Sequence, residues 1–381
     1  MENDTGWYRE KGSEGRRVTL RYLTKQSIED IAIGAAVLGT GGGGDPTLGR
    51  WMALAALEEH GPCPLLSVDE VDDEALVVPS GMMGAPTVLA EKIPGGTELD
   101  SAFELMEQAL GRRIEATMPV EVGGVNSLLP LVLALRKGIP VIDADAMGRA
   151  FPEVHMTSFH LDGLPPGPAA IADEKGNGVL LYPKDGTWYE RLARDLTIQM
   201  GCSVAVLDYP LSGQQVKQSG ILSTLSLAEQ WGSLLRQARG DGLDPAGVLM
   251  EKTGALPLIR GKVTDVDRRT DGGFTKGALD LEGIEDWRGK NLQLSFQNEF
   301  LVARAGEEVL ASTPDLITVL DNETGLPITT EAIRYGMRVW ALAFPCHPKW
   351  RTERGIDVVG PRCFGYDFEF VPAELRRGVR K

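Results

Sequence analysis

The sequence has few residues of the kinds that build zinc sites and disulfide frameworks. Its 381 residues include four cysteines and four histidines. The cysteines lie far apart with no CxxC pair, so we expect free thiols in a reducing compartment and no sulfur-rich zinc site. No His-Glu-x-x-His, Gly-x-Ser-x-Gly or Ser-x-x-Lys motif occurs, so the common hydrolase signatures are missing.

Long apolar runs and an excess of positive charge are also missing. Nowhere do about 18 uncharged apolar residues follow one another, and the first seventeen residues are polar, so we expect neither a membrane span nor a signal peptide. Lys and Arg number 39 against 54 for Asp and Glu, a net charge of −15. Because such a surface repels phosphate backbones and anionic lipids, we expect a cytoplasmic protein that binds neither nucleic acid nor membrane.

The length and composition predict two globular domains. Apolar residues make up 43% and charged residues 24%, as in soluble folded proteins, and the chain exceeds the size of one ordinary core. We expect residues 1–20 to form a flexible tail and residues 21–180 an α/β domain. Residues 181–381 are predicted to form an α+β domain that is β-rich from about residue 260, where short β-type runs alternate with turns.

Three short apolar runs in the first domain, at 75–78, 116–120 and 139–142, each lead into a polar or glycine-rich loop. This pattern predicts an α/β fold with a largely parallel sheet flanked by helices. The carboxyl ends of parallel strands gather at one edge of such a sheet, where ligands bind. The residues that we expect to meet there are Glu121, Asn126, Asp143 and Asp145.

A run of glycines, GTGGGGDP at 39–46, lies between two segments with helical spacing of apolar residues. No strand precedes the glycines and no Gly-Lys-Ser/Thr follows them, so the sequence predicts no nucleotide cofactor. Asp45 and Pro46 read as the N-cap and first position of a helix. The loop Gly41, Gly42, Gly43 and Gly44 could therefore bind a small polar ligand or an oxyanion, or it could be a tight turn beneath neighbouring elements.

Carboxylates in apolar surroundings are further candidates for acid–base or cation-binding residues. Asp143 and Asp145 are two apart after a strand, so in extended chain they point the same way. They could share a cation or divide acid and base roles, or one could cap the following segment while the other binds Arg149. Glu91 and Glu121 are flanked by apolar residues and glycines, so each needs a partner, which could be Lys92, an arginine or a metal ion.

Cys346 and His347 could act as metal ligands or as nucleophile and base. Adjacent residues on an extended chain point apart, which argues against a dyad made by these two alone. An acidic cleft with few histidines suits Mg²⁺ or Mn²⁺, whereas zinc would need His347, Cys346 or a second carboxylate.

Six ordered motifs carry a family resemblance. They are AIGAAVLGTGGGGDP, SGMMGAPTVLAEKIPGG, EVGGVNSLLP, PVIDADAMGRAFPE, TTEAIRYGMRV and WRTERGIDVVGPRCFGYD. Together they resemble the S-methyl thiohydantoin desulfurase family over about residues 22–370. The resemblance implies a two-domain α/β protein that hydrolyses a five-membered cyclic ureide-like ring. In the named member, water replaces a methylthio group, which gives methanethiol and a hydantoin.

The resemblance also implies which residues matter. The positions that match its motifs are Gly41, Gly42, Gly43, Gly44, Asp45, Glu91, Glu121, Asn126, Asp143, Asp145, Arg149 and Glu153. We expect catalysis by a carboxylate among Glu121, Asp143 and Asp145, with Arg149 orienting the substrate. The predicted substrate-binding residues are the four glycines, Asp45, Asn126 and Glu91.

A divalent ion, if it activates the water, would be held by Asp143, Asp145, His347 and Cys346. The expected partner is a small cyclic substrate, and the apolar helical stretches are consistent with a homo-oligomer. The alternative is a non-catalytic ureide-binding or regulatory subunit of a hydantoinase or oxoprolinase system.

Overall fold

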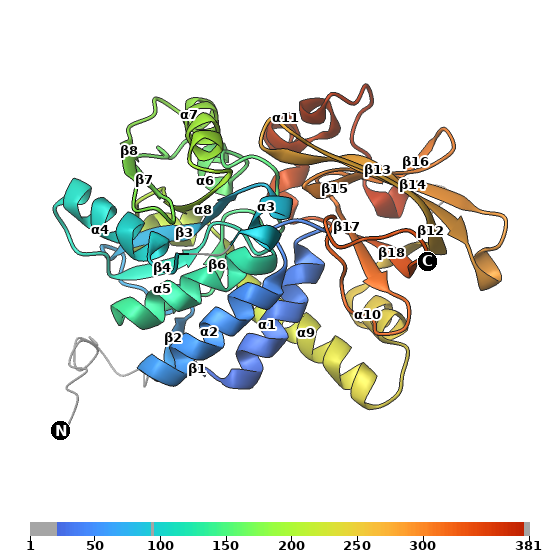
Figure 1. The fold of residues 1–381 in the computed structure, drawn as a ribbon, viewed down its shortest axis with the longest axis horizontal. Coiled ribbons are helices and arrows are strands. Elements are labelled where there is room, and N and C mark those ends of the chain that lie inside the picture. The colour runs from blue at the N-terminus through green and yellow to red at the C-terminus, as the bar shows by residue number, and fades with distance from the viewer. Residues whose placement is uncertain (1–20, 93–94, 377–381) are drawn as a thin grey trace.

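The computed structural model describes residues 21–92 and 95–376, and it has an α/β part and a β-rich part that lie side by side (Figure 1). This confirms the predicted fold class. The predicted tail, residues 1–20, lies outside the described residues.

Helices surround the first sheet and connect it to the second (Figure 1). The α-helices are α1 (Lys25–Leu38), α2 (Pro46–His60), α3 (Pro86–Glu91), α4 (Glu98–Leu110), α5 (Leu129–Lys137), α6 (Ser158–Leu161), α7 (Gly186–Gln199), α8 (Gly213–Ser219), α9 (Thr224–Gly240), α10 (Pro245–Thr253) and α11 (Glu353–Val359). No helix of the described part is long and apolar enough to cross a membrane.

The first sheet is mixed. Its strands are β1 (Arg21–Leu23), β2 (Cys63–Leu66), β3 (Leu76–Gly84), β4 (Ala116–Pro119), β5 (Val141–Ile142), β7 (Ala169–Ala172), β8 (Gly178–Leu181), β9 (Ser203–Leu207) and β10 (Leu211–Ser212). The order is β1-β2-β5-β4-β3-β9-β7-β8, with β10 on β3. The strands β2, β5, β4 and β3 run parallel, as predicted, whereas β9, β7 and β8 continue the sheet antiparallel.

The second sheet is antiparallel throughout. Its strands are β12 (Leu256–Asp271), β13 (Phe274–Gly283), β14 (Asn291–Gln297), β15 (Glu299–Ala305), β16 (Glu308–Ser312), β17 (Leu316–Asp321) and β18 (Arg338–Phe344). Their order is β16-β15-β14-β13-β12-β18-β17. A two-stranded ribbon joins β6 (Ala144–Asp145) to β11 (Ile221–Leu222).

The division between the two sheets lies near Leu256, close to residue 260, where the β-rich part was predicted to begin. The chain after β8 returns to the first sheet, because the fully buried strand β9 is inserted between β3 and β7. The strand is apolar on both faces and needs neighbours on both edges, so the helical segment around it belongs with the first sheet.

Two glycines allow α1 and α9 to cross closely. A Cβ at Gly34 would lie 1.7 Å from the carbonyl oxygen of Ala228, and one at Gly232 would lie 1.8 Å from that of Asp30. Arg236 adds a two-pronged ion pair to Asp30, with N–O distances of 2.7 and 2.9 Å. This crossing fixes α1, and the glycine loop begins directly at its end.

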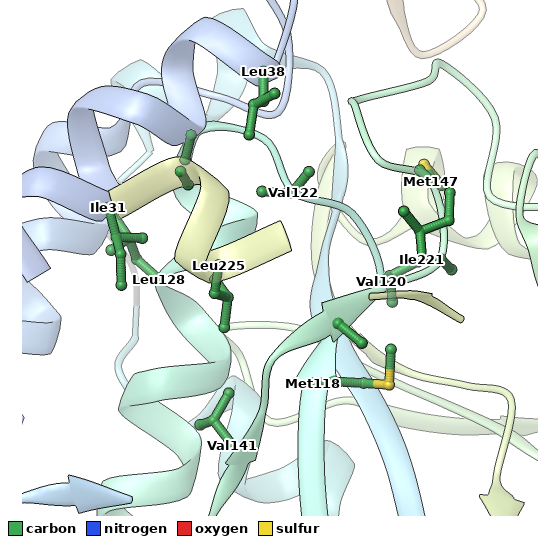
Figure 2. Packing of buried hydrophobic residues seen from close by; sticks show 14 of the residues in the cluster. Ile31, Leu38, Met118, Val120, Val122, Leu128, Val141, Met147, Ile221 and Leu225 are labelled. Atoms are coloured by element: carbon green, nitrogen blue, oxygen red, sulfur yellow. The ribbon is translucent and has the colours of Figure 1, made fainter. Parts of the chain in front are cut away.

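The main core lies beneath the loops that follow the parallel strands. Figure 2 shows Val120 and Val122 among buried side chains from α1 and α9, including Leu38 and Leu225. Each buried valine contributes about 1.5 to 3 kcal/mol. The segment that carries Glu121 is therefore anchored on both sides of that residue.

Candidate active site

The glycine loop joins α1 to α2, as predicted. Asp45 caps α2 by accepting a hydrogen bond from the Thr47 N–H at 2.7 Å. Gly41, Gly43 and Gly44 have φ angles of 86°, 72° and 78°, a left-handed conformation that side chains disfavour.

These glycines bring main chain close to other parts of the site. A Cβ at Gly43 would lie 2.6 Å from the main chain of Gly123, and one at Gly124 would lie 1.9 Å from the Gly44 carbonyl oxygen. At Gly42 a Cβ would lie 1.9 Å from a carboxylate oxygen of Glu299. The loop is thus packed between the segment after β4 and the start of β15, where any side chain would collide.

A small cavity, about 60 Å³ in volume, lies at this junction. A water molecule takes up about 30 Å³ in the liquid, so the cavity suits a small ligand. Its described lining residues are Gly43, Gly44, Gly81, Met82, Met83, Gly84, Val120, Glu121, Asn126, Met147, Phe151, Pro152, Val154, Arg194, Val206, Asp208, Asn298 and Glu299. The cavity therefore combines apolar walls with a few ionisable groups, as ligand sites do.

Glu121 is held in this cavity by Asn126. The Asn126 amide donates to Glu121 Oε1 at 2.6 Å and is itself fixed to β3 by two hydrogen bonds with the Met82 main chain. Burial raises the pKa of Glu121 to about 7, and the nearby Asp145 adds to this, while the Asn126 hydrogen bond opposes it. Glu121 can therefore gain and lose a proton near neutral pH.

Glu299, at the start of β15, is the second carboxyl group. It is 2% exposed, and its Oε2 has no hydrogen-bond partner among the described residues. Burial and the neighbouring charge of Glu121 raise its pKa well above the ordinary value, while Arg149 and the Gly43 main chain favour its ionised form. Both carboxyl groups line the same cavity, where the negative charge of Glu121 disfavours ionisation of Glu299.

Two further ionisable side chains line the cavity. Burial raises the pKa of Asp208 to about 7, and its Oδ2 accepts a hydrogen bond from the Tyr189 hydroxyl at 2.8 Å. Arg194 is the cationic side chain among the described lining residues. It forms an ion pair with Glu190 at 2.8 Å and lies 4.1 Å from the centre of the Phe274 ring.

The predicted acids Asp143 and Asp145 lie outside the cavity lining, and their carboxylates are occupied. Asp143 accepts from the N–H and the hydroxyl of Ser226, at 3.0 and 2.5 Å. Asp145 accepts from the N–H groups of Val122, Met147 and Gly148, at 2.7, 3.2 and 2.8 Å. Both acids therefore organise the loops around the cavity.

Arg149 is buried and fully engaged. Its guanidinium donates to the carbonyl oxygens of Ala150, Pro314 and Asp315, at 2.9, 2.9 and 2.8 Å, and to the Thr40 hydroxyl at 2.8 Å. Burial lowers its pKa to about 10, although the neighbouring Glu299 opposes this. Arg149 therefore joins the two parts of the protein and acts on the cavity through its charge.

Several other predicted residues lie apart from the cavity lining. Glu91 is exposed at the end of α3, and its neighbour Lys92 pairs with Glu174 at 2.6 Å. Asp45 is exposed and caps α2. Glu153, whose pKa burial raises to about 7, lies 3.4 Å from His155 Nδ1.

The proposed metal ligands do not come together. His347 Nδ1 accepts from the Lys349 N–H at 3.3 Å, and the buried Cys346 has a thiol pKa that burial raises to about 12. Across residues 21–92 and 95–376, no three His, Cys, Asp or Glu side chains form a possible metal site. These side chains do not fit a bound ion, and the mechanism below uses protein groups only.

Sequence reasoning missed Glu299, Asp208 and Arg194. Asp208 directly follows the apolar strand β9, which is the pattern that singled out Asp143 after β5, so the same rule could have found it. Glu299 lies in the second sheet, and only the folded chain brings it to the glycine loop.

Comparisons with known proteins show the family and the fold of the chain. Family models described as the S-Me-THD-like N-terminal and C-terminal domains match residues 26–182 and 184–373. A crystal structure of a protein from Chromobacterium violaceum is similar at a TM-score of 0.73 and 22% identity, over 93% of this chain and all of that one, which shows a shared fold. No curated protein matches the sequence. The chain therefore belongs to the S-Me-THD-like family, that of the S-methyl thiohydantoin desulfurases.

Proposed function

We propose that the protein hydrolyses a five-membered ring of the S-methyl thiohydantoin type, with Glu121 and Glu299 as an acid–base pair. The observation that carries this proposal is that two buried carboxyl groups line one small cavity, where the charge of Glu121 raises the pKa of Glu299. A group with a pKa of about 7 is suited to move protons at neutral pH.

The roles follow from the two environments. Asn126 donates a hydrogen bond to Glu121, which favours its ionised form, so Glu121 is the carboxylate that takes a proton from water. The resulting hydroxide adds to the ring carbon that bears the methylthio group. Glu299, whose Oε2 has no donor among the described residues, is the protonated partner and gives its proton to the ring nitrogen, which neutralises the charge that develops there.

The intermediate then returns to a carbonyl. Its hydroxyl proton returns to Glu299, the carbon–sulfur bond breaks, and the methylthiolate leaves with the proton that Glu121 had taken. One water is consumed, and methanethiol and a hydantoin are released. Both carboxyl groups end in their starting states, so the cycle balances without an oxidant or reductant.

The surrounding residues support these roles. The hydrogen bond from Asn126 holds the carboxylate of Glu121 in one orientation. Less conformational entropy is therefore lost when this base reacts. Arg194 lines the cavity while paired with Glu190, and the apolar side chains of Met82, Met147 and Phe151 limit access of bulk water. The cavity volume favours a small ring over a larger substrate.

The test is a turnover assay in ¹⁸O-labelled water with S-methyl thiohydantoins and hydantoins, before and after chelation. We expect methanethiol release and one ¹⁸O atom in the hydantoin product, with activity that survives chelation. Ring-opened products from hydantoins would support a cyclic amidase instead. Binding of the rings without any turnover would favour the ureide-binding alternative.

A further inference from the structure

Asp208 is a buried acid in the cavity that the proposed reaction does not use. It is fully buried, directly after the inserted strand β9. Its Oδ2 accepts from Tyr189, but its Oδ1 has no hydrogen-bond partner among the described residues. A buried carboxylate oxygen without a partner is costly, unless a ligand supplies the missing donor.

The donor must be small and must enter the cavity that Asp208 lines. Rings of the hydantoin type carry N–H groups in the ring plane, and a carboxylate oxygen is a strong acceptor for such a donor. The Tyr189 hydroxyl holds the other oxygen, so the carboxylate is oriented before the ligand arrives.

We propose that Asp208 recognises the substrate by accepting a hydrogen bond from a ring N–H, so that the site selects rings that are unsubstituted at that nitrogen. This inference rests on the proposed function for the identity of the ring. It assigns Asp208 a role in specificity and leaves the proton transfers to Glu121 and Glu299.

The test measures binding of hydantoin, 1-methylhydantoin and 3-methylhydantoin by calorimetry to the full chain and to Asp208→Asn. In the variant, the amide oxygen can accept from Tyr189, which turns the amide N–H₂ toward the unpartnered position as a donor. We expect hydantoin affinity to fall about 10- to 100-fold, the range for a hydrogen bond to a charged group. Asp162→Asn, at an exposed residue outside the cavity lining, is the matched control and should bind like the wild type.

The isomer that is methylated at the donating nitrogen should bind weakly to the wild type and equally weakly to Asp208→Asn, because it has no N–H to donate to Asp208. The other isomer should behave as hydantoin does. The inference is overturned if hydantoin fails to bind, if the variant binds it normally, or if the variant weakens all three ligands equally. The wild-type preference between isomers gives a readout even if the variant folds poorly, since equal binding of all three rings also overturns the inference.

Turnover assays on the same proteins separate this inference from the proposed function. Selective binding that depends on Asp208, without turnover, would retain the inference and reject the hydrolase. Turnover that does not depend on Asp208 would reject the inference and retain the hydrolase.

Discussion

Two pairs of buried acids have contrasting surroundings. Asp143 and Asp145 follow β5, and the hydrogen bonds of the Ser226 side chain and of surrounding N–H groups occupy their carboxylates. Glu121 and Glu299 meet at a cavity, where they share few donors and Glu299 keeps an unpartnered oxygen. The first pair holds loops in place, whereas the second is arranged for proton transfer.

The comparison teaches that burial alone does not mark a catalytic acid. Burial raises the pKa of both Asp145 and Glu121 to about 7. What differs is access, because Glu121 lines the cavity, whereas the N–H groups of Val122, Met147 and Gly148 occupy the carboxylate of Asp145. Substitution of Glu121 should therefore mainly affect turnover, whereas substitution of Asp145 should mainly affect the stability of the fold.

The largest expected effect is on turnover in Glu121→Gln. Removing the general base should reduce kcat about 10²- to 10⁴-fold, while the ring still binds. Turnover of S-methyl thiohydantoin and calorimetric binding of hydantoin measure the two properties. Glu91→Gln, at an exposed glutamate outside the cavity lining, is the matched control and should keep full activity. A Glu121→Gln variant with activity within threefold of wild type would remove this residue from the mechanism.

A large effect on stability is expected in Asp145→Asn. The amide cannot accept from all three N–H groups, and leaving buried donors unpaired should cost about 2 to 4 kcal/mol in the free energy of unfolding. Denaturant titration measures this loss. Activity per folded molecule should fall less than tenfold, and a loss of 10²-fold or more in well-folded protein would restore the catalytic role predicted from sequence.

A pH-dependent stability effect is expected at Glu121. Its pKa is raised in the folded state, so the folded protein holds a proton that the unfolded chain releases above about pH 4.5. Stability therefore falls as pH rises from about 4.5 to 7, by up to about 3 kcal/mol from this group. Glu121→Gln should be more stable than wild type at pH 8 and equal to it near pH 4, as measured by thermal unfolding. Equal stability at both pH values would contradict the raised pKa.

A small effect is expected in Asp143→Asn. The variant loses one of two hydrogen bonds with Ser226, so the free energy of unfolding should fall by about 1 kcal/mol, with turnover within threefold of wild type. Turnover abolished in a folded variant would instead place Asp143 in the mechanism.

Much of this arrangement could be predicted from local sequence. The glycine run between helical segments and the Asp45-Pro46 start of α2 follow from capping and turn rules. Glu121 and Asn126, five residues apart after an apolar strand, are within reach of each other once the intervening glycines turn the chain.

The rest depended on contacts between distant segments. Glu299 reaches the glycine loop only because Gly42 has no side chain in its path. No local sequence pattern around Glu299 predicts this contact. The donors to Asp145 are main-chain N–H groups. Almost every residue has such a group, so the sequence does not show which of them will donate to Asp145. The same limit explains why Arg149 was expected to contact substrate, whereas carbonyl groups of the second part occupy its guanidinium.

The most direct test of the contrast between the two pairs is the pH dependence of kcat/KM for ring hydrolysis. Since Asp145 and Asp208 also have a pKa of about 7, the profile must be compared between wild type and Glu121→Gln. We predict that wild-type kcat/KM rises with pH up to about pH 7, as Glu121 loses its proton, and that this rise is shallower in the residual activity of Glu121→Gln, where Asp208 still titrates. A wild-type profile that is flat between pH 5 and 9, or an unchanged rise in the variant, would contradict the account.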